Sequence, residues 1–164
     1  MKKKFISKIG VLGGTFDPAH IGHLKISIEA KKRYKLKKII WAVTKKSPFK
    51  NKSYLDLKKR IKLAKKISSK NKFIKVRFFE NKIKSSKTAD LIDHLKKNRK
   101  STEIYFIMGA DNLVNFHKWY KWKEIASKSM LLVFNRGKYK TKSLRSITYK
   151  KYNNIRLKFV NFKK

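Results

Sequence analysis

The sequence contains no cysteine and only 9 acidic residues. Without thiols, neither disulfides nor thiolate metal sites can hold the fold, and redox catalysis by thiols is excluded. No apolar run approaches the roughly 20 residues that a membrane span needs, and the N-terminal lysines lead into a strand pattern rather than into the apolar core of a signal peptide. We therefore expect a soluble, cytoplasmic protein.

The scarcity of acidic residues leaves a large excess of positive charge. Against the 9 Asp and Glu stand 47 Lys and Arg, which gives a formal net charge of +38, so partners that carry phosphate are expected. The excess is mostly lysine and is spread along every segment, whereas nucleic-acid binders more often gather Lys and Arg on one face. We interpret the charge mainly as a solvated surface and regard nucleic acid as the less favoured partner.

Strand patterns alternate with helical patterns along the chain. Its 164 residues, 41% of them apolar or aromatic, suffice for one domain over residues 1–164 with a sizeable core. Buried strands are predicted at residues 5–12, 37–43, 73–79, 103–108, 129–134 and 155–162, helices at 22–34, 55–67, 88–95 and 116–125, and an irregular loop after residue 137. This order predicts an α/β fold, a Rossmann-like doubly wound parallel sheet.

Segments rich in glycine or polar residues follow the first four predicted strands. They are residues 13–14, 47–50, 80–88 and 109–112. An open parallel sheet binds its ligand outside the carboxyl ends of its strands, at the point where the strand order reverses. We therefore expect these segments to form one site.

The first of these segments has the features of a phosphate cradle. Gly13 and Gly14 can take backbone angles that are closed to other residues and let a phosphate approach the main chain, and a helix that begins near Ile21 offers unpaired N–H groups. His20 and His23 are three residues apart, so both rings can project to one side of the first turn and donate to phosphate oxygens. An isolated pair would more often be a surface cap, but the glycine turn before it favours the phosphate role.

Residues 13–23, Gly-Gly-Thr-Phe-Asp-Pro-Ala-His-Ile-Gly-His, resemble the signature of the nicotinate mononucleotide adenylyltransferases in the HxGH nucleotidyl transferase superfamily. The likeness continues in order through residues 41–50, 109–125 and 134–136, which makes it far more specific than a lone HxGH. It implies transfer of AMP from ATP to nicotinate mononucleotide in NAD synthesis, with deamido-NAD and pyrophosphate as products and Mg²⁺ bridging the phosphates.

The resemblance also implies roles for individual residues. It places His20, His23 and Lys50 on the ATP phosphates as catalytic groups. Nucleotide contacts are implied for Gly13, Gly14, Thr15, Phe16, Gly22, Gly109, Asp111 and Arg136, and contacts with the mononucleotide for Thr88, Trp119 and Asp111. No dedicated carboxylate cage for the metal is expected.

Several of these residues have a structural alternative. Asp111 follows a strand and a glycine, so it is as readily a helix N-cap as a ligand of ribose. Trp119 and Trp122 stand at helical spacing, and we expect Trp122 to belong to the core and Trp119 to contact the nicotinate ring. Arg136 could pair with a phosphate or a carboxylate, or be a surface residue of a loop.

The chain also departs from the family pattern. Lys87 and Leu91 replace the usual Tyr and Thr near the nicotinate position, and the chain stops at Lys164, before the serine- and threonine-rich turn and helix with which the family ends. We therefore expect either that the sequence is truncated or that the protein binds ATP more weakly than its relatives do.

Three other functions remain as alternatives. They are adenylylation of nicotinamide mononucleotide or another phosphate acceptor, a nucleotide-binding remnant without activity, and nucleic-acid binding, which would depend steeply on salt concentration. The sequence makes no prediction of oligomeric state.

Overall fold

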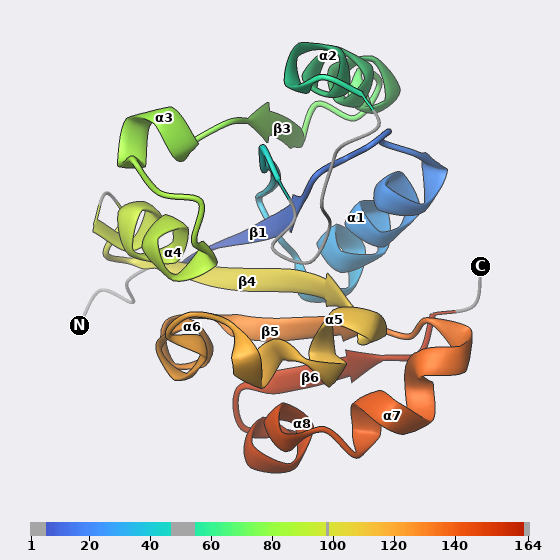
Figure 1. Ribbon diagram of the computed structural model, residues 1–164, viewed down its shortest axis with the longest axis vertical. Coiled ribbons are helices and arrows are strands. Elements are labelled where there is room, and N and C mark those ends of the chain that lie inside the picture. Colours follow the sequence, from blue (N-terminus) through green and yellow to red (C-terminus); the bar gives the residue numbers. More distant parts are fainter. Residues whose placement is uncertain (1–5, 47–54, 98, 163–164) are drawn as a thin grey trace.

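A computed structural model describes residues 6–46, 55–97 and 99–162. Its centre is a six-stranded parallel sheet in the order β3-β2-β1-β4-β5-β6 (Figure 1). The strands are β1 (Ser7–Gly14), β2 (Lys38–Val43), β3 (Ile74–Arg77), β4 (Thr102–Gly109), β5 (Met130–Phe134) and β6 (Leu157–Val160). The order reverses between β1 and β4, which confirms the predicted doubly wound, Rossmann-like fold.

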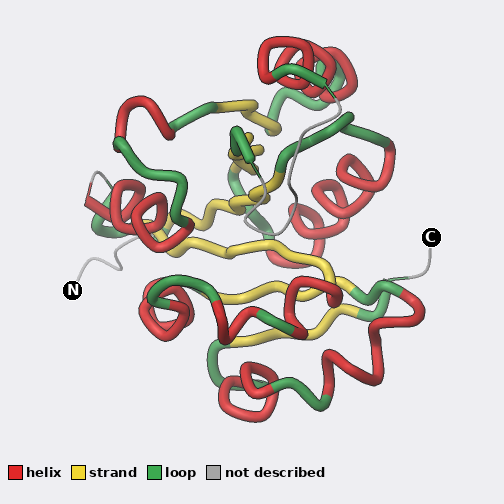
Figure 2. Tube along the Cα trace, in the orientation of Figure 1, coloured by secondary structure: helices red, strands yellow, loops and turns green. Residues whose placement is uncertain are grey.

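Helices lie on both faces of the sheet, as Figure 2 shows. The helices α1 (Ile21–Tyr34) and α2 (Leu57–Ser68) pack on one face, and α4 (Thr88–Lys97), α5 (Ala110–Val114) and α6 (Trp122–Lys128) pack on the other. The remaining short helices are α3 (Glu80–Ile83), η1 (Phe116–Lys118), η2 (Gly137–Tyr139), α7 (Lys140–Leu144) and α8 (Ile147–Tyr152).

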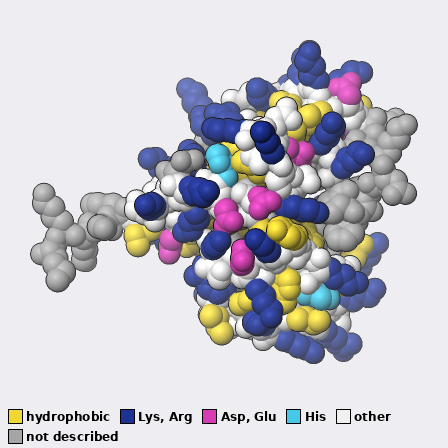
Figure 3. All heavy atoms as spheres, turned by 60° about the vertical axis from the view of Figure 1, so that its left-hand side comes forward, with side chains coloured by type: hydrophobic (Ala, Val, Ile, Leu, Met, Phe, Trp, Pro, Cys, Tyr) yellow, Lys and Arg dark blue, Asp and Glu magenta, His cyan; other side chains and the backbone are white. Residues whose placement is uncertain are grey.

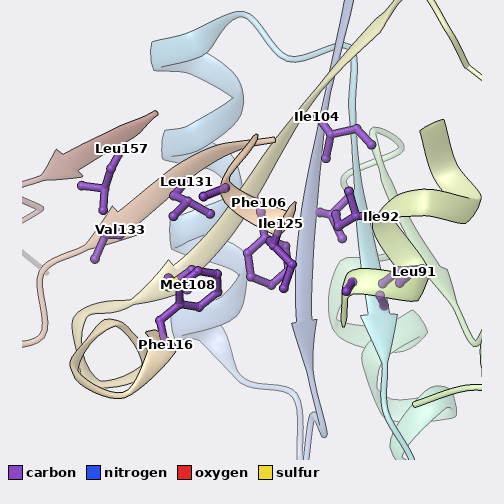
Figure 4. Packing of buried hydrophobic residues seen from close by; sticks show 14 of the residues in the cluster. Leu91, Ile92, Ile104, Phe106, Met108, Phe116, Ile125, Leu131, Val133 and Leu157 are labelled. Atoms are coloured by element: carbon purple, nitrogen blue, oxygen red, sulfur yellow. The ribbon is translucent and has the colours of Figure 1, made fainter. Parts of the chain in front are cut away.

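The two faces carry separate cores because successive side chains of a strand point to opposite sides of the sheet. In β4, Ile104, Phe106 and Met108 enter the core beneath α4, α5 and α6 (Figure 4). Tyr105 and Ile107 enter the core beneath α1 and α2. Strands buried on both faces read as nearly continuous apolar runs, which is why the sequence located them well.

Local signals fix the ends of the first two helices. Lys35 takes the left-handed conformation (φ 55°) after α1, and its N–H donates to the carbonyl of Lys31. The Asp56 carboxylate accepts from the Lys59 N–H at 2.9 Å and caps α2. These caps set where the chain leaves and re-enters the helical layer.

The prediction of one helix over residues 116–125 is wrong. The 3₁₀ turn η1 ends at Lys118, and α6 begins only at Trp122. Between them Lys121 has a φ of 49°, which a right-handed helix does not accommodate. The aromatic residues at helical spacing therefore belong to two short elements joined by a turn.

The prediction of an irregular loop after residue 137 is also wrong. This segment contains η2, α7 and α8. The Ser146 hydroxyl accepts from the Tyr149 N–H at 3.2 Å and caps α8, and Ser143 and Thr148 are fully buried. Serine and threonine serve here as caps and helix-packing residues rather than as loop residues.

Positive side chains are not gathered in one patch on the face that Figure 3 shows. Figure 3 shows Lys and Arg side chains spread across the visible face, with acidic and apolar side chains between them. None of the helices in the described ranges is long and apolar enough to cross a membrane.

Candidate active site

The predicted site residues gather where β1 and β4 end. Gly13 and Gly14 are the last residues of β1, and Gly109 is the last residue of β4. Arg136 lies two residues beyond the end of β5. Because the strand order reverses between β1 and β4, this edge is where such a sheet opens a crevice for a ligand.

The two glycines at the end of β1 do not adopt conformations reserved for glycine. Both are paired in register with the end of β2, and neither has a positive φ. The chain turns instead at Phe16, whose φ is 50°. The backbone freedom that the sequence offers at Gly13 and Gly14 is therefore not used in this structure. What glycine supplies is space, since a Cβ at Gly13 would meet only Phe106 within 4 Å, at 3.8 Å.

His20 and His23 form a reciprocal cap at the start of α1. The Gly22 N–H donates to His20 Nδ1 at 3.0 Å, and the His20 N–H donates to His23 Nδ1 at 3.1 Å. The two ring centroids are 4.0 Å apart. Because each Nδ1 accepts a hydrogen bond, the proton of each neutral imidazole is carried on Nε2, which is then a donor. The cap and a phosphate role use different nitrogens, so the two interpretations are compatible.

His23 is held in its neutral form. Burial, followed by the positive charges of His20 and Arg136, lowers the pKa of His23 from 6.5 to about 4. Its ring centroid lies 4.7 Å from that of Phe16 and 6.0 Å from that of Trp41. At neutral pH the side chain therefore offers a hydrogen-bond donor without a charge of its own.

Phe16 supports His23 from within the core. Its side chain is 2% exposed, and its ring stacks on Trp41 with the centroids 5.1 Å apart. Trp41 Nε1 donates to Ser27 Oγ, and Ser27 Oγ donates to the His23 carbonyl, both at 2.8 Å. The Phe16 ring thus belongs to the packing under the histidine.

Asp111 and Arg136 form an ion pair across the ends of β4 and β5. Arg136 Nη1 lies 3.2 Å from Asp111 Oδ2. The N-cap position of α5 is occupied by Gly109, so the N-cap alternative for Asp111 is wrong. Asp111 Oδ1 is buried and has no hydrogen-bond partner among the described residues. An unpaired buried acceptor is costly, so this oxygen is suited to a donor from a ligand.

Thr88 lines a pocket together with Gly13 and Phe106. Trp119 is not among the residues that line this pocket, but its ring packs edge-on against Phe106 with the centroids 6.2 Å apart. Trp122 is partly buried against the same core, as expected. The structure therefore brings Thr88 and Gly13 together, and Trp119 adjoins their pocket through Phe106.

The predicted catalytic Lys50 lies outside the described residues, as does the whole segment 47–54. The residues that lead into this segment are described. The Thr44 N–H donates to the Gly14 carbonyl at 2.8 Å, and the Lys45 N–H donates to Glu80 Oε1 at 3.2 Å. Burial raises the pKa of Glu80. The chain that leads toward Lys50 is thus fastened to the end of β1 and to α3.

Sequence reasoning missed Arg60, which is 2% exposed within α2. Its guanidinium donates to four main-chain carbonyls, those of Leu55 (3.1 Å), Thr15 (2.7 Å), Thr44 (2.8 Å) and Lys45 (2.9 Å). Arg60 therefore holds the main chain of Thr15, a residue predicted to contact nucleotide. The signal that could have found Arg60 is a charged residue on the apolar face of a predicted helix.

A second hollow lies between α2 and β3, on another part of the surface. Its lining includes Lys65, Lys72 and Lys75, and none of the predicted site residues. The residues singled out by the sequence therefore point to the carboxyl edge of β1 and β4 as the candidate site.

Comparison with known proteins places the chain among nucleotidyl transferases. The cytidylyltransferase-like family model matches residues 11–156. A protein of Pelagibacter ubique (strain HTCC1062) named "Probable nicotinate-nucleotide adenylyltransferase" is 66% identical over 158 residues, which cover 96% of this chain and 87% of that protein. A protein of the same name from Bradyrhizobium sp. (strain ORS 278) is 38% identical over 130 residues, which cover 79% of this chain and 67% of that protein.

Solved structures show the same fold. The Plasmodium falciparum nicotinic acid mononucleotide adenylyltransferase complexed with NaAD matches with a TM-score of 0.75 at 16% identity, over 96% of this chain and 76% of that chain. The same enzyme complexed with APC also matches with a TM-score of 0.75, at 17% identity. At such low identity these matches concern the fold, and the family follows from the sequence relatives.

Proposed function

The chain belongs to the cytidylyltransferase-like family, with relatives named as nicotinate-nucleotide adenylyltransferases, and from this premise we propose that it transfers AMP from ATP to nicotinate mononucleotide. The products are deamido-NAD and pyrophosphate. The observation that carries the proposal is the reciprocal cap of His20 and His23. It fixes both rings through their Nδ1 atoms at the N-terminus of α1, so that an Nε2 donor can be directed toward an anion there.

The reaction joins two phosphates and needs no general base. An oxygen of the mononucleotide phosphate attacks the α-phosphorus of ATP, and a new P–O bond forms. The bond from that phosphorus to the bridging oxygen of the β-phosphate breaks, and pyrophosphate leaves with the electron pair. A phosphate monoester has its second pKa near 6 and is largely ionised at neutral pH. The protein's task is therefore to position the phosphates and to stabilise charge.

We assign the ATP phosphates to the β1 end of the site. His20 and His23 donate from Nε2 as charge develops on the leaving oxygens, and the N-terminus of α1 adds its positive dipole end. The space above Gly13 allows close approach to the main chain. Removing one such preorganised donor typically costs about 10²–10³ in kcat, so we assign most of the chemical acceleration to this pair.

We assign the nucleoside groups to the β4 end. Asp111 Oδ1 is a buried acceptor that a ribose hydroxyl would satisfy, and Arg136 brings a positive charge close enough to act on His23. Thr88 lines the pocket beside Gly13, and Trp119 borders it through Phe106. We therefore place the nicotinate ring on the Thr88 and Trp119 side.

The donor set fits a Mg²⁺ ion that arrives with ATP. Mg²⁺ keeps several waters and is usually held by substrate phosphates with one or two carboxylates. Within the described ranges no group of three or more His, Asp or Glu side chains could hold a metal ion. When bound, Mg²⁺ would neutralise phosphate charge. The carboxylate of Asp111 at this edge is already paired with Arg136, so the substrate phosphates and water would supply most of the ligands of the ion.

Turnover with defined substrates tests the proposal. The chain is incubated with ATP, Mg²⁺ and either nicotinate or nicotinamide mononucleotide, and pyrophosphate and dinucleotide are measured. We expect faster product formation with the nicotinate compound and loss of product in His23→Ala. A clear preference for the amide would overturn the substrate assignment. ATP binding without dinucleotide from either acceptor would overturn the transferase proposal.

A further inference from the structure

We propose that Arg60 is a positioning residue that sets the geometry of His23 by fastening the loops after β1 and β2 to α2. This inference deepens the proposed function, because it names a residue on which the site depends although it is not placed against substrate. Arg60 lies in the buried face of α2 and bonds only to main-chain carbonyls in the described structure.

The bonds of Arg60 fan out to three segments. Nη1 reaches the carbonyls of Thr15, in the loop after β1, and Thr44, directly after β2. Nη2 reaches Lys45, and Nε reaches Leu55 ahead of α2. A guanidinium has donors in a fixed planar fork, whereas a lysine ammonium is a compact charge on a flexible stem. One Arg side chain can therefore hold three segments in a fixed relation.

A buried charge without an ion-pair partner is costly unless hydrogen bonds compensate for its loss of water. Arg60 is 2% exposed, and no ion pair with it is found among the described residues. The nearby acid is Glu80. Burial raises its pKa, and the hydrogen bond from the Lys45 N–H and the positive charges of Lys45 and Arg60 offset only part of that rise. An apolar side chain would fill the same place on the helix without that cost. What Arg60 adds, compared with an apolar side chain, is its set of hydrogen bonds to the four main-chain carbonyls.

Phe16 connects the hydrogen bonds of Arg60 to the position of His23. The carbonyl that Arg60 binds at Thr15 belongs to the peptide bond that leads into Phe16, where the chain turns with a φ of 50°. The Phe16 ring lies 4.7 Å from the His23 ring. A second hydrogen bond connects the segment ahead of α2 to the same loop, because the Leu55 N–H donates to Asp17 Oδ1 at 2.7 Å. Displacing the Thr15 carbonyl would therefore move the ring on which His23 rests.

The test compares Arg60 with Arg156, a matched arginine away from the site. Arg156 also donates to main-chain carbonyls, those of Ala126 (3.0 Å) and Ser127 (3.3 Å), but it lies just before β6, at the opposite edge of the sheet. The variants are Arg60→Lys, Arg60→Met, Arg156→Lys and Arg156→Met. For each, kcat and KM are measured with ATP and nicotinate mononucleotide. NMR of the unliganded protein gives the pKa of His23.

We expect both Arg60 variants to lower kcat by about 10- to 100-fold, since small misplacements of reacting groups have effects of this size. We expect KM for the mononucleotide to change less than kcat, and Arg60→Lys to retain more activity than Arg60→Met. The pKa of His23 should rise toward 6.5 in the Arg60 variants as the packing around its ring loosens. Both Arg156 variants should match the parent protein.

An unchanged His23 pKa in Arg60→Lys, or equal losses of kcat in the Arg60 and Arg156 variants, would overturn the proposal. If Arg60→Met does not fold, Arg60→Lys decides alone. If Arg60→Lys does not fold either, the role is purely structural and the proposal fails. The histidine titration needs no substrate. A failure of the proposed function, seen as no turnover in the parent chain, is therefore distinguishable from a failure of this inference.

Discussion

The two sides of the site differ in how far the protein satisfies its own polar groups. On the β1 side, residues 13–23, the histidines cap each other and Arg60 holds the Thr15 carbonyl. On the β4 side, residues 109–111 with 135–136, Asp111 Oδ1 and Asn135 Oδ1 are buried with no hydrogen-bond partner in the part of the chain that the structure describes. The groups of the β1 side are thus held in place by hydrogen bonds within the protein, whereas the β4 side has buried acceptors that a ligand could satisfy.

This difference suggests a division of labour. Groups that are already fixed do not need to reorganise in the transition state, so they stabilise charge effectively. Groups with unsatisfied hydrogen-bonding capacity gain most from a bound ligand, because their desolvation cost is already present. We therefore expect changes on the β1 side to lower kcat, and changes on the β4 side to raise KM.

The largest expected effect follows from removing His23. His23→Ala eliminates a neutral Nε2 donor, and we expect kcat to fall by about 10²–10³, as for other preorganised donors. Steady-state kinetics with ATP and nicotinate mononucleotide measure this loss, with thermal unfolding as the check on folding. Near-normal turnover in a well-folded His23→Ala protein would remove the β1 side from the chemistry.

His20→Asn separates capping from phosphate handling in the same assay. Asparagine is a good N-cap residue and can accept from the Gly22 N–H in place of His20 Nδ1. It lacks the imidazole Nε2 donor. We expect little loss of stability and a fall in kcat that approaches that of His23→Ala. Activity equal to the parent protein would mean that His20 serves only as a cap.

A smaller effect, on KM, is expected from Arg136→Met. This change removes the partner of Asp111, whose bond to Arg136 is 3.2 Å long. The pair is partly exposed, with Arg136 44% and Asp111 30% accessible, and solvent limits such a pair to about 1 kcal/mol, so we expect KM for at least one substrate to rise roughly threefold to tenfold, with a smaller change in kcat. Arg136→Lys keeps the charge and should lie between. A loss confined to kcat would contradict the division of labour.

The sequence predicted the strands, and the edge of the sheet at which the candidate site lies, because both depend on local patterns. Runs of apolar residues marked the buried strands, and the parallel order brought the segments after them to one edge. The His20 and His23 pair was identifiable from its spacing. Its reciprocal hydrogen bonding was not, because that depends on side-chain geometry rather than on residue type.

Arg60 shows why the rest could not be predicted. Its carbonyl partners include Thr15 and Thr44, which are 45 and 16 residues away in the sequence. A main-chain carbonyl leaves no trace in a sequence, since every residue has one. The available hint was position, because Arg60 falls between Leu57 and Ala64 on the buried face of α2. A charge on an apolar stripe therefore merits the same scrutiny as a motif.

Replacing one glycine by alanine on each side of the site tests the difference between the two sides with a smaller change. A Cβ at Gly109 would lie 2.5 Å from Asp111 Oδ1 and 3.2 Å from Arg136 Cδ, so Gly109→Ala must displace the ion pair. A Cβ at Gly13 would meet only Phe106, at 3.8 Å. We expect Gly109→Ala to raise KM roughly threefold to tenfold, a loss of about 1 kcal/mol of hydrogen bonding.

Gly13→Ala should leave the melting temperature unchanged and lower kcat. The methyl group fits the free protein but occupies space in the pocket that Gly13 lines. The measurements are kcat, KM and the melting temperature of both alanine variants, each compared with the parent protein. Parent-like kinetics in Gly13→Ala would show that no ligand approaches that part of the main chain, which would contradict the phosphate assignment.

The smallest expected effect is on the pH dependence of stability. It depends on both sides of the site, because Arg136 on the β4 side influences the pKa of His23 on the β1 side. The folded state lowers the pKa of His23 from 6.5 to about 4, through burial first and then through His20 and Arg136. The unfolded chain thus binds a proton more readily than the folded chain. This contribution to stability is complete above pH 6.5 and is lost as the pH falls toward 4. After allowance for partial solvent access, we expect a loss of about 1 kcal/mol at pH 5, or about 2–4 °C in melting temperature.

His23→Gln is the matched control for this pH effect. Glutamine at the third helical position can accept from the His20 N–H, as in a capping box, but it does not titrate. We expect the melting temperature of the parent protein to fall by about 2–4 °C more than that of His23→Gln between pH 7 and pH 5. Arg136→Met should reduce the difference, because it removes a positive charge that disfavours protonated His23. If the melting temperature falls equally in the parent protein and in His23→Gln, His23 titrates as an ordinary exposed histidine. The β1 side would then lack the neutral hydrogen-bond donor on which its proposed role depends.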